Sequence, residues 1–140
     1  MTKNYKIIAK YIKDMSSETP DVETFIFVKD YISKYQLNID IKSIPLKNKM
    51  VEINTIMKFE DKNENKKKSH FELNYSTIIE VNDTVKEKND LEKIILCDVQ
   101  IEIYPFLEKS LLDLLHNSGF PEIKFEKKIN FEKLFTERFN

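Results

Sequence analysis

Hydrophobic and polar residues alternate with a period of two along several segments of the chain, the pattern of strands with one apolar face. The clearest segment places Leu37, Ile39 and Ile41 between polar neighbours. The same alternation runs from Val51 to Phe59 and from Phe71 to Val81, with one exception in each segment. The sequence therefore predicts three strands, joined to one another by polar turns.

A fourth strand is predicted at the N-terminus, over Tyr5–Lys13. Ile8 and Ile12 fall on one of its faces, and apolar side chains also occur on the other. This pattern predicts a strand that is covered on both faces. The charged tract Asp61–Lys68 lies between two of the strands and is expected to be a solvated hairpin loop.

The period changes after the polar stretch Asp83–Asp90, because apolar residues then recur at spacings of three and four. This spacing predicts a helix from about Val99 to Asn117. Gly119 suits the left-handed position after its end, and Pro105 is expected near its start, where a missing N–H costs least. The apolar residues that recur at these spacings are Ile101, Tyr104, Leu107, Leu111, Leu114 and Leu115.

A short final helix is predicted after Asn130, a residue suited to N-capping. Phe131, Leu134, Phe135 and Phe139 share one face of it. Isolated helices of this length are marginal in water, so this face is expected to dock on the rest of the protein. Strands first and helices last predict one α+β domain over residues 1–140, with helices on one face of a four-stranded antiparallel sheet.

Composition narrows the functional classes. The 140 residues include 23 basic and 24 acidic ones, giving a formal net charge of −1. This balance argues against a dedicated nucleic-acid-binding protein. The chain shows neither a signal peptide nor an apolar run of about 18 residues, so no direct membrane insertion is expected. A single glycine excludes the common phosphate-binding loops, and a single cysteine fits the reducing cytoplasm.

Catalytic chemistry has little support in the sequence. A nucleophilic site would combine Cys97 with His70 or His116, but Cys97 follows an apolar run and is expected to be a small buried residue. One cysteine and two distant histidines show no metal-ligand spacing. We therefore expect neither an enzyme nor a cofactor. The ten phenylalanines and six tyrosines indicate instead a subunit interface or an apolar groove beyond the core.

Four motifs carry a family resemblance. Tyr11–Pro20 reads YIKDMSSETP, Ile103–Phe106 reads IYPF, and Gly119–Ile123 and Ile129–Phe135 follow in the same order. Together they resemble the SecB family of bacterial protein-export chaperones. The chain departs from the family pattern at Gln100 and Lys128, where members usually carry proline.

The resemblance implies a cytoplasmic holdase that assembles as a homotetramer, a dimer of dimers. It would need no cofactor, bind unfolded precursor proteins and pass them to the SecA motor. A second interpretation is a SecB-like chaperone dedicated to one partner, such as an antitoxin. Extended clients suit strand edges and aromatic pockets, where their backbone can be hydrogen-bonded.

Site residues follow from the motif matches. SecA would bind at Asp14 and Glu18, with Glu72 and Asn74 on the predicted strand from Phe71 to Val81, although Asp14 and Glu18 could also be simple turn residues. Tyr104 and Phe106 are expected to hold the dimers together. The other six candidates form the expected client groove, with core or tetramer packing as the alternative role for each: Leu37, Ile39, Ile41, Phe131, Leu134 and Phe135.

Overall fold

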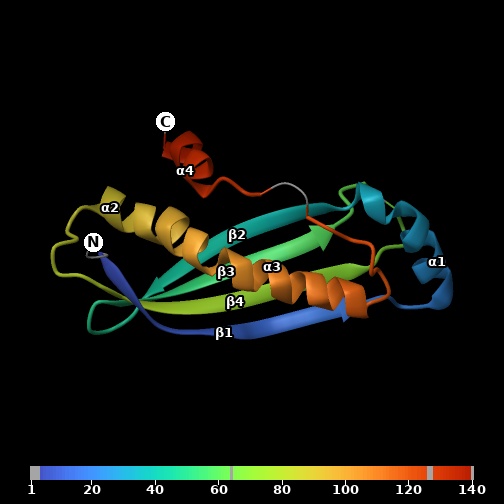
Figure 1. Ribbon diagram of the computed structural model, residues 1–140, viewed down its shortest axis with the longest axis horizontal. Helices are drawn as coiled ribbons and strands as arrows, with labels where there is room; N and C mark the ends of the chain where they lie inside the picture. Colours follow the sequence, from blue (N-terminus) through green and yellow to red (C-terminus); the bar gives the residue numbers. More distant parts are fainter. Residues whose placement is uncertain (1–3, 64, 126–127, 140) are drawn as a thin grey trace.

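The computed structural model describes residues 4–63, 65–125 and 128–139 (Figure 1). The side chains of residues 138 and 139 lie outside this description, including that of Phe139. Four strands and four α-helices follow one another, with short 3₁₀ and π-helical segments between some of them. Their order is β1 (Tyr5–Glu18), α1 (Val22–Tyr31), a 3₁₀ turn (Ile32–Lys34), β2 (Gln36–Pro45), β3 (Met50–Glu60), β4 (His70–Val81), α2 (Lys88–Lys93), a π-helical segment (Ile94–Asp98), α3 (Val99–Asn117) and α4 (Phe131–Phe139).

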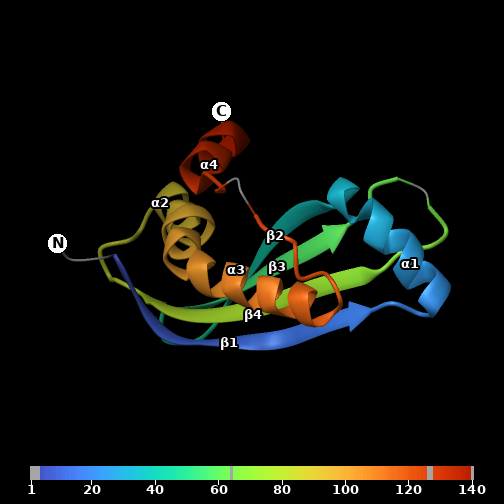
Figure 2. The same ribbon diagram turned by 45° about the vertical axis from the view of Figure 1, so that its right-hand side comes forward.

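The strands form one antiparallel sheet in the order β1-β4-β3-β2, which confirms the predicted fold class. The period-two pattern sets its two faces. Ile53 and Met57 of β3, with Leu73 and Ile79 of β4, are fully buried beneath the helices. The polar residues between them point to the opposite face, which we call the outer face. Figure 2 shows α3 lying along the sheet, with α1 at one end of the strands.

The helical layer is longer than the sequence predicts. The predicted helix matches α3, but α2 and the π-helical segment precede it without a break, so helical structure begins at Lys88, inside the polar stretch Asp83–Asp90. Pro105 therefore lies well inside the helix and not near its start, which corrects that expectation. Proline has no backbone N–H, so the carbonyl of Ile101, one turn earlier, receives no helical hydrogen bond from residue 105. Ile101 itself lies on the half-exposed side of the helix.

Gln100, near the start of α3, is a polar residue whose side chain is buried. Its side chain accepts a hydrogen bond from Thr55 Oγ1 at 2.9 Å and donates one to the carbonyl of Ile95 at 3.1 Å. Both Gln100 and Thr55 are about 1% exposed, and the paired amide spares them the cost of an unsatisfied buried group. Gln100 thus links the π-helical segment to β3, at a position where SecB family members usually carry proline.

One helix was missed, and one expectation about strand β1 needs correction. Helix α1 was not predicted, because its apolar run from Thr24 to Val28 has no helical period; Asp21 Oδ1 caps it by accepting from Thr24 N at 2.8 Å. Strand β1 was predicted to be covered on both faces, but it is an edge strand whose Ile8, Tyr11 and Met15 are more than 40% exposed in the single chain.

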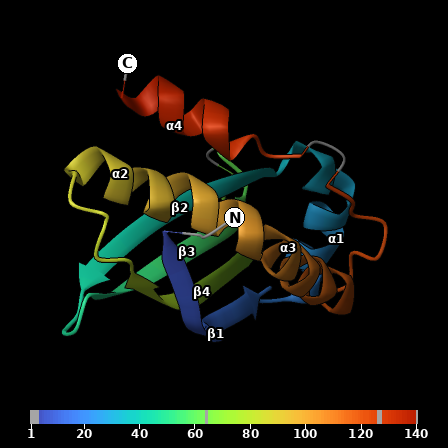
Figure 3. The same cartoon turned by 60° about the vertical axis from the view of Figure 1, so that its left-hand side comes forward.

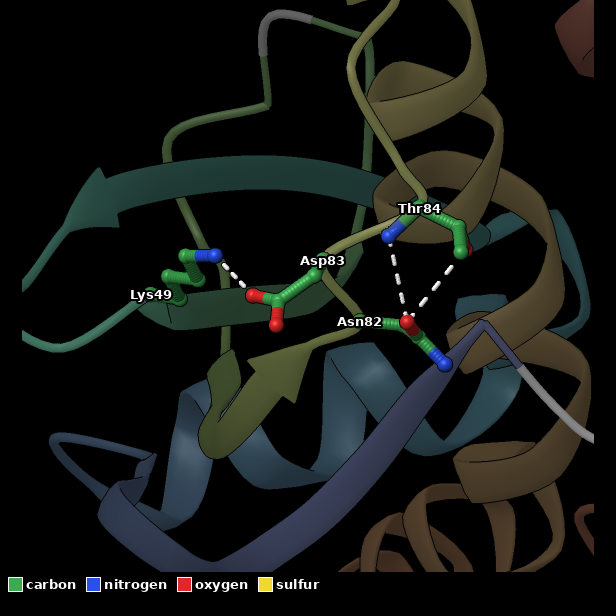
Figure 4. A network of polar contacts seen from close by, with 4 residues as sticks. All are labelled: Lys49, Asn82, Asp83 and Thr84. Atoms are coloured by element: carbon green, nitrogen blue, oxygen red, sulfur yellow. Dashed lines mark hydrogen bonds and ion pairs between the residues drawn. The ribbon is translucent and has the colours of Figure 1, made fainter.

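The β2–β3 turn is tied to the connection that leaves β4 (Figure 4). Asn48 and Lys49 both have φ of 62°, and the backbone oxygen of Lys49 accepts a hydrogen bond from Val81 N at 2.9 Å. The Lys49 ammonium also pairs with Asp83. Next to Asp83, Asn82 Oδ1 accepts from the backbone and the hydroxyl of Thr84. These contacts fix the turn against the chain that leads to α2.

Helix α4 docks on the helical layer, as its apolar face predicts. Asn130 Oδ1 accepts a hydrogen bond from Lys133 N at 3.0 Å, which confirms the expected N-cap. The ring of Phe131 lies 5.6 Å from that of Tyr104 in an edge-on contact. Figure 3 shows α4 beyond the long helix, on the side away from the strands.

Gly119 gives a direct test of the packing at the end of α3. Its φ is +106°, and a Cβ there would stand 2.5 Å from Cε1 of Phe25 in α1. We expect Gly119→Ala to lower the free energy of unfolding by about 1–3 kcal/mol, since it adds both backbone strain and a clash. Denaturant titration measures this change.

A double-mutant cycle separates the two causes. Phe25→Leu removes the ring atoms that the new Cβ would meet, so Gly119→Ala should cost less in that background than in the natural chain. Equal costs in both backgrounds would show that the contact with Phe25 does not contribute.

Candidate functional site

An open hollow of about 920 Å³ lies beside the first residues of β2. One wall is formed by the end of α1 and the 3₁₀ turn, and the other by the segment between α3 and α4. The floor comes from β2 and β3. The lining residues are Lys29, Asp30, Ile32, Ser33, Tyr35, Leu37, Phe59, Glu122, Ile123, Lys124, Phe125 and Ile129.

Aromatic rings form the base of the hollow. Tyr35 and Phe59 lie with ring centroids 5.6 Å apart, and Phe125 meets Phe59 edge-on at 5.7 Å. The Tyr35 hydroxyl accepts a hydrogen bond from Ser69 N at 3.1 Å, which fixes the ring, and burial raises the pKa of this phenol. A rigid aromatic base of this kind favours apolar and aromatic side chains.

Charges at the hollow balance one another. Lys29 and Asp30 come from α1, and Glu122 and Lys124 from the opposite wall. Two residues of each sign provide no net charge. The hollow can therefore accept an apolar segment without selecting strongly for the charge of the residues around it.

The six residues predicted to line the client groove lie on two different elements, β2 and α4. Leu37 lines the hollow, and Ile39 and Ile41 continue along the same face of β2, partly buried against the core. Phe131 is 4% exposed and packs on Tyr104. On the same helix Leu134 is 53% exposed and Phe135 partly buried.

Most of the residues that line the hollow carry no signal for a groove in the sequence. Phe59 was assigned only to a strand face, and Ile123 appeared only inside a family motif. Tyr35 and Phe125 carried no periodic signal. The one available hint was the surplus of aromatic residues, which indicates a groove but does not place it.

A second candidate surface lies on the outer face of the sheet. Residues directly opposite each other in an antiparallel pair point to the same side. Asp14 of β1 is opposite Asn74 of β4, and Ser16 is opposite Glu72. Glu18 is opposite His70, two residues before Glu72 on the same face. The structure therefore brings together all four residues predicted to bind SecA.

Two of the acids on this face form ion pairs with lysines. Lys58 Nζ lies 3.5 Å from Glu72, and Lys13 Nζ lies 3.0 Å from Glu52. Asn54 also donates to Glu52, at 2.7 Å. This bond, together with the one from Lys13, holds the pKa of Glu52 below its usual range. The outer face therefore presents acids at Asp14 and Glu18 beside ion pairs at its centre.

A third surface is apolar. Ile8, Ile12 and Met15 of β1 are between 43% and 48% exposed, and Phe106 of α3 is 49% exposed. Lys10 Nζ lies 3.4 Å from the centre of the Phe106 ring, which joins the two elements. Exposed apolar side chains gathered in this way are typical of protein–protein contacts.

The groups considered for catalysis lie in ordinary structural settings. Cys97 is fully buried in the π-helical segment, and burial, with a smaller effect of Asp98, raises the pKa of its thiol. His116 Nε2 contacts the carbonyl of Ile123 at 2.9 Å. Among the described residues, no three His, Cys, Asp or Glu side chains are grouped to hold a metal ion. None of the helices in the described ranges is both long and apolar enough to span a membrane.

Comparison with known proteins identifies the family of the chain. The family model of the preprotein translocase subunit SecB matches residues 1–140. A Pelagibacter ubique protein described as "Putative protein-export protein SecB" is 58% identical over 140 residues, which cover both chains completely. The protein-export protein SecB of Rhodospirillum rubrum is 24% identical over 132 residues, covering 94% of this chain and 80% of that one.

A solved structure shares the fold. The SecB-like chaperone of Mycobacterium tuberculosis, solved in complex with an antitoxin peptide, matches with a TM-score of 0.61 at 11% identity and covers 89% of this chain and 91% of its own. The sheet order, the long helix and the full-length family match agree with one another. This chain belongs to the SecB family of protein-export chaperones.

Proposed function

We propose that this chain is a cytoplasmic holdase that binds unfolded precursor proteins and delivers them to the SecA motor. The aromatic hollow beside β2 is the observation that carries this proposal. It offers apolar contacts without a net charge, as capture of many different sequences requires. A holdase of this kind works by mass action, because a protein that binds only unfolded chains draws the equilibrium toward them.

Assembly into a homotetramer, a dimer of dimers, would cover the apolar surface of β1 and α3. Phe106 is suited to such a contact, whereas Tyr104 is partly buried and already packs on Phe131. Several hollows in one assembly would also bind successive segments of one client, so weak local contacts add through effective concentration.

A chaperone dedicated to one partner, such as an antitoxin, remains the second candidate. The neighbour from Mycobacterium tuberculosis was solved with an antitoxin peptide, but at 11% identity it shares only the fold. The relative at 58% identity carries an export description over the full length. We therefore favour export, and refusal of generic unfolded proteins would favour the dedicated partner.

Substitutions in the hollow test client capture. Ile123→Ser and Phe125→Ser each remove a partly buried apolar side chain from the lining. Each should weaken binding of a reduced and alkylated, permanently unfolded secretory protein by about tenfold, the effect of losing one buried apolar contact. Isothermal titration measures the affinity.

Val22→Ser is the matched control, because Val22 is apolar but 68% exposed and does not line the hollow. It should bind the unfolded protein as the natural chain does. Equal affinities for all three variants and the natural chain would contradict the assignment of the hollow.

Charge reversal on the outer face tests SecA binding. The family resemblance implies that the positively charged zinc-binding tail of SecA meets an acidic surface here. Asp14→Lys combined with Glu18→Lys should weaken SecA binding by about tenfold or more at low salt while sparing client capture. Surface plasmon resonance with immobilised SecA measures the effect.

Glu87→Lys combined with Glu137→Lys makes the same change in total charge on the helical side of the sheet. This control should bind SecA normally. If it loses binding as strongly as the outer-face pair, net charge and not the location of Asp14 and Glu18 governs the interaction.

A further inference from the structure

The outer face of the sheet holds polar side chains that are buried, although the described helices lie against the opposite face (Figure 2). Ser76 of β4 is 0% exposed and Asn54 of β3 is 7% exposed. Among the described residues, Ser76 Oγ, Asn54 Oδ1 and Asn74 Oδ1 are buried oxygens without a hydrogen-bond partner. A buried oxygen of this kind destabilises the free protein, so each of the three calls for an explanation.

These three oxygens belong to one group of neighbours, which we call the acceptor cluster. Asn54 is directly opposite Ser76, and Asn74 lies two residues before Ser76 on the same face of β4. Side chains opposite each other in an antiparallel pair have Cβ atoms about 5 Å apart, and diagonal neighbours are about 7–8 Å apart. Asp14 of β1 is opposite Asn74 and adds a carboxylate at the border of the cluster.

The side chain of Lys13 crosses the acceptor cluster. Its Nζ lies 3.0 Å from Glu52 Oε2 on β3, so the side chain must pass over β4, which lies between β1 and β3. It starts at the bulge beside Asn74 and ends at Glu52, which is opposite Ile78. Ser76 lies midway between these two positions, so the methylene groups of the lysine cover it. They shield its hydroxyl from water but offer it no hydrogen bond.

The position of the Lys13 ammonium indicates which ligand suits this part of the outer face. Glu52 and Asp14 supply negative charge at two borders of the acceptor cluster, and the cluster adds oxygens that can accept hydrogen bonds. Asn54 Nδ2 already donates to Glu52 at 2.7 Å, which leaves its oxygen available. A guanidinium carries five N–H donors in one plane, against three on an ammonium. An arginine side chain therefore matches this set of acceptors better than a lysine does.

We propose that Glu52 and the acceptor cluster form a cation-binding site that Lys13 fills in the free protein, and that an arginine side chain of a basic partner displaces Lys13 from it. This inference rests on the proposed binding of SecA to the outer face and adds a second point of contact to it. Asp14 would attract a basic segment by its charge alone. The site at Glu52 would favour segments that also place an arginine at the correct spacing, because only these can replace Lys13.

A double-mutant cycle tests the competition between Lys13 and the partner. Lys13→Met removes the ammonium and keeps an unbranched side chain, so SecA should bind about two- to fivefold more tightly, because an exposed ion pair no longer has to be broken. In a Glu52→Gln background this ion pair is already absent, and Lys13→Met should give little further gain. Surface plasmon resonance with immobilised SecA measures all four affinities. An equal gain in both backgrounds would show that Lys13 acts through its charge alone and would overturn the proposal.

Ser76→Ala tests the acceptor cluster itself. It removes one of the three oxygens, so it should weaken SecA binding about tenfold, as expected for a lost hydrogen bond to a charged group. Thr77→Val is the matched control. The Thr77 hydroxyl is also fully buried and without a partner among the described residues, but it lies on the helix-covered face. This control should bind SecA normally. Normal binding by both variants, with denaturant titration showing both folded, would contradict contact at Ser76.

A second probe separates this inference from the proposed function. It is a synthetic peptide in which arginine alternates with serine, measured against the same variants by isothermal titration. If SecA does not bind the natural chain, but the peptide does and binds Lys13→Met more tightly, delivery to SecA fails while the cation-binding site stands. If neither SecA nor the peptide binds, both fail. If SecA binds but its affinity is unchanged by Lys13→Met and by Ser76→Ala, the site is wrong while SecA binding stands.

Discussion

Burial of one continuous helix against the two central strands is the interaction on which the rest of the structure depends. Ile103, Leu107, Leu111 and Leu115 of α3 are at most 1% exposed, and each such side chain contributes about 1.5–3 kcal/mol. A helix is about 10 Å wide, whereas four strands spaced about 4.8 Å apart span roughly 15 Å. The helix therefore covers β3 and β4 well and leaves β1 and β2 at the margins of the core.

The surfaces available for binding are the ones that this packing leaves open. At the β2 margin, α1 and the segment before α4 enclose the aromatic hollow. At the β1 margin, apolar residues remain exposed, and the proposed assembly would cover them. The outer face carries acids and lysines in ion pairs, and Asp14 and Glu18, in the last part of β1, present acids away from those pairs. Client, subunit and SecA would thus meet three different parts of one sheet.

Much of the fold follows from the sequence because its signals are local. Alternation predicted the strands, three-and-four spacing predicted α3, and Asn130 marked the start of α4. Helix α1 was missed because β-branched and aromatic residues fill its centre, and its stability comes from packing and the Asp21 cap. The hollow was missed for a different reason: Tyr35, Phe59 and Phe125 meet only through tertiary structure, which no spacing along the chain records.

Native mass spectrometry, with and without an unfolded precursor diluted from denaturant, tests whether the protein is a holdase. We expect an assembly of four chains of 16.7 kDa that takes up one unfolded precursor and ignores the same protein once folded. A monomer or dimer that captures no unfolded protein would contradict it and would direct the search to a single dedicated partner.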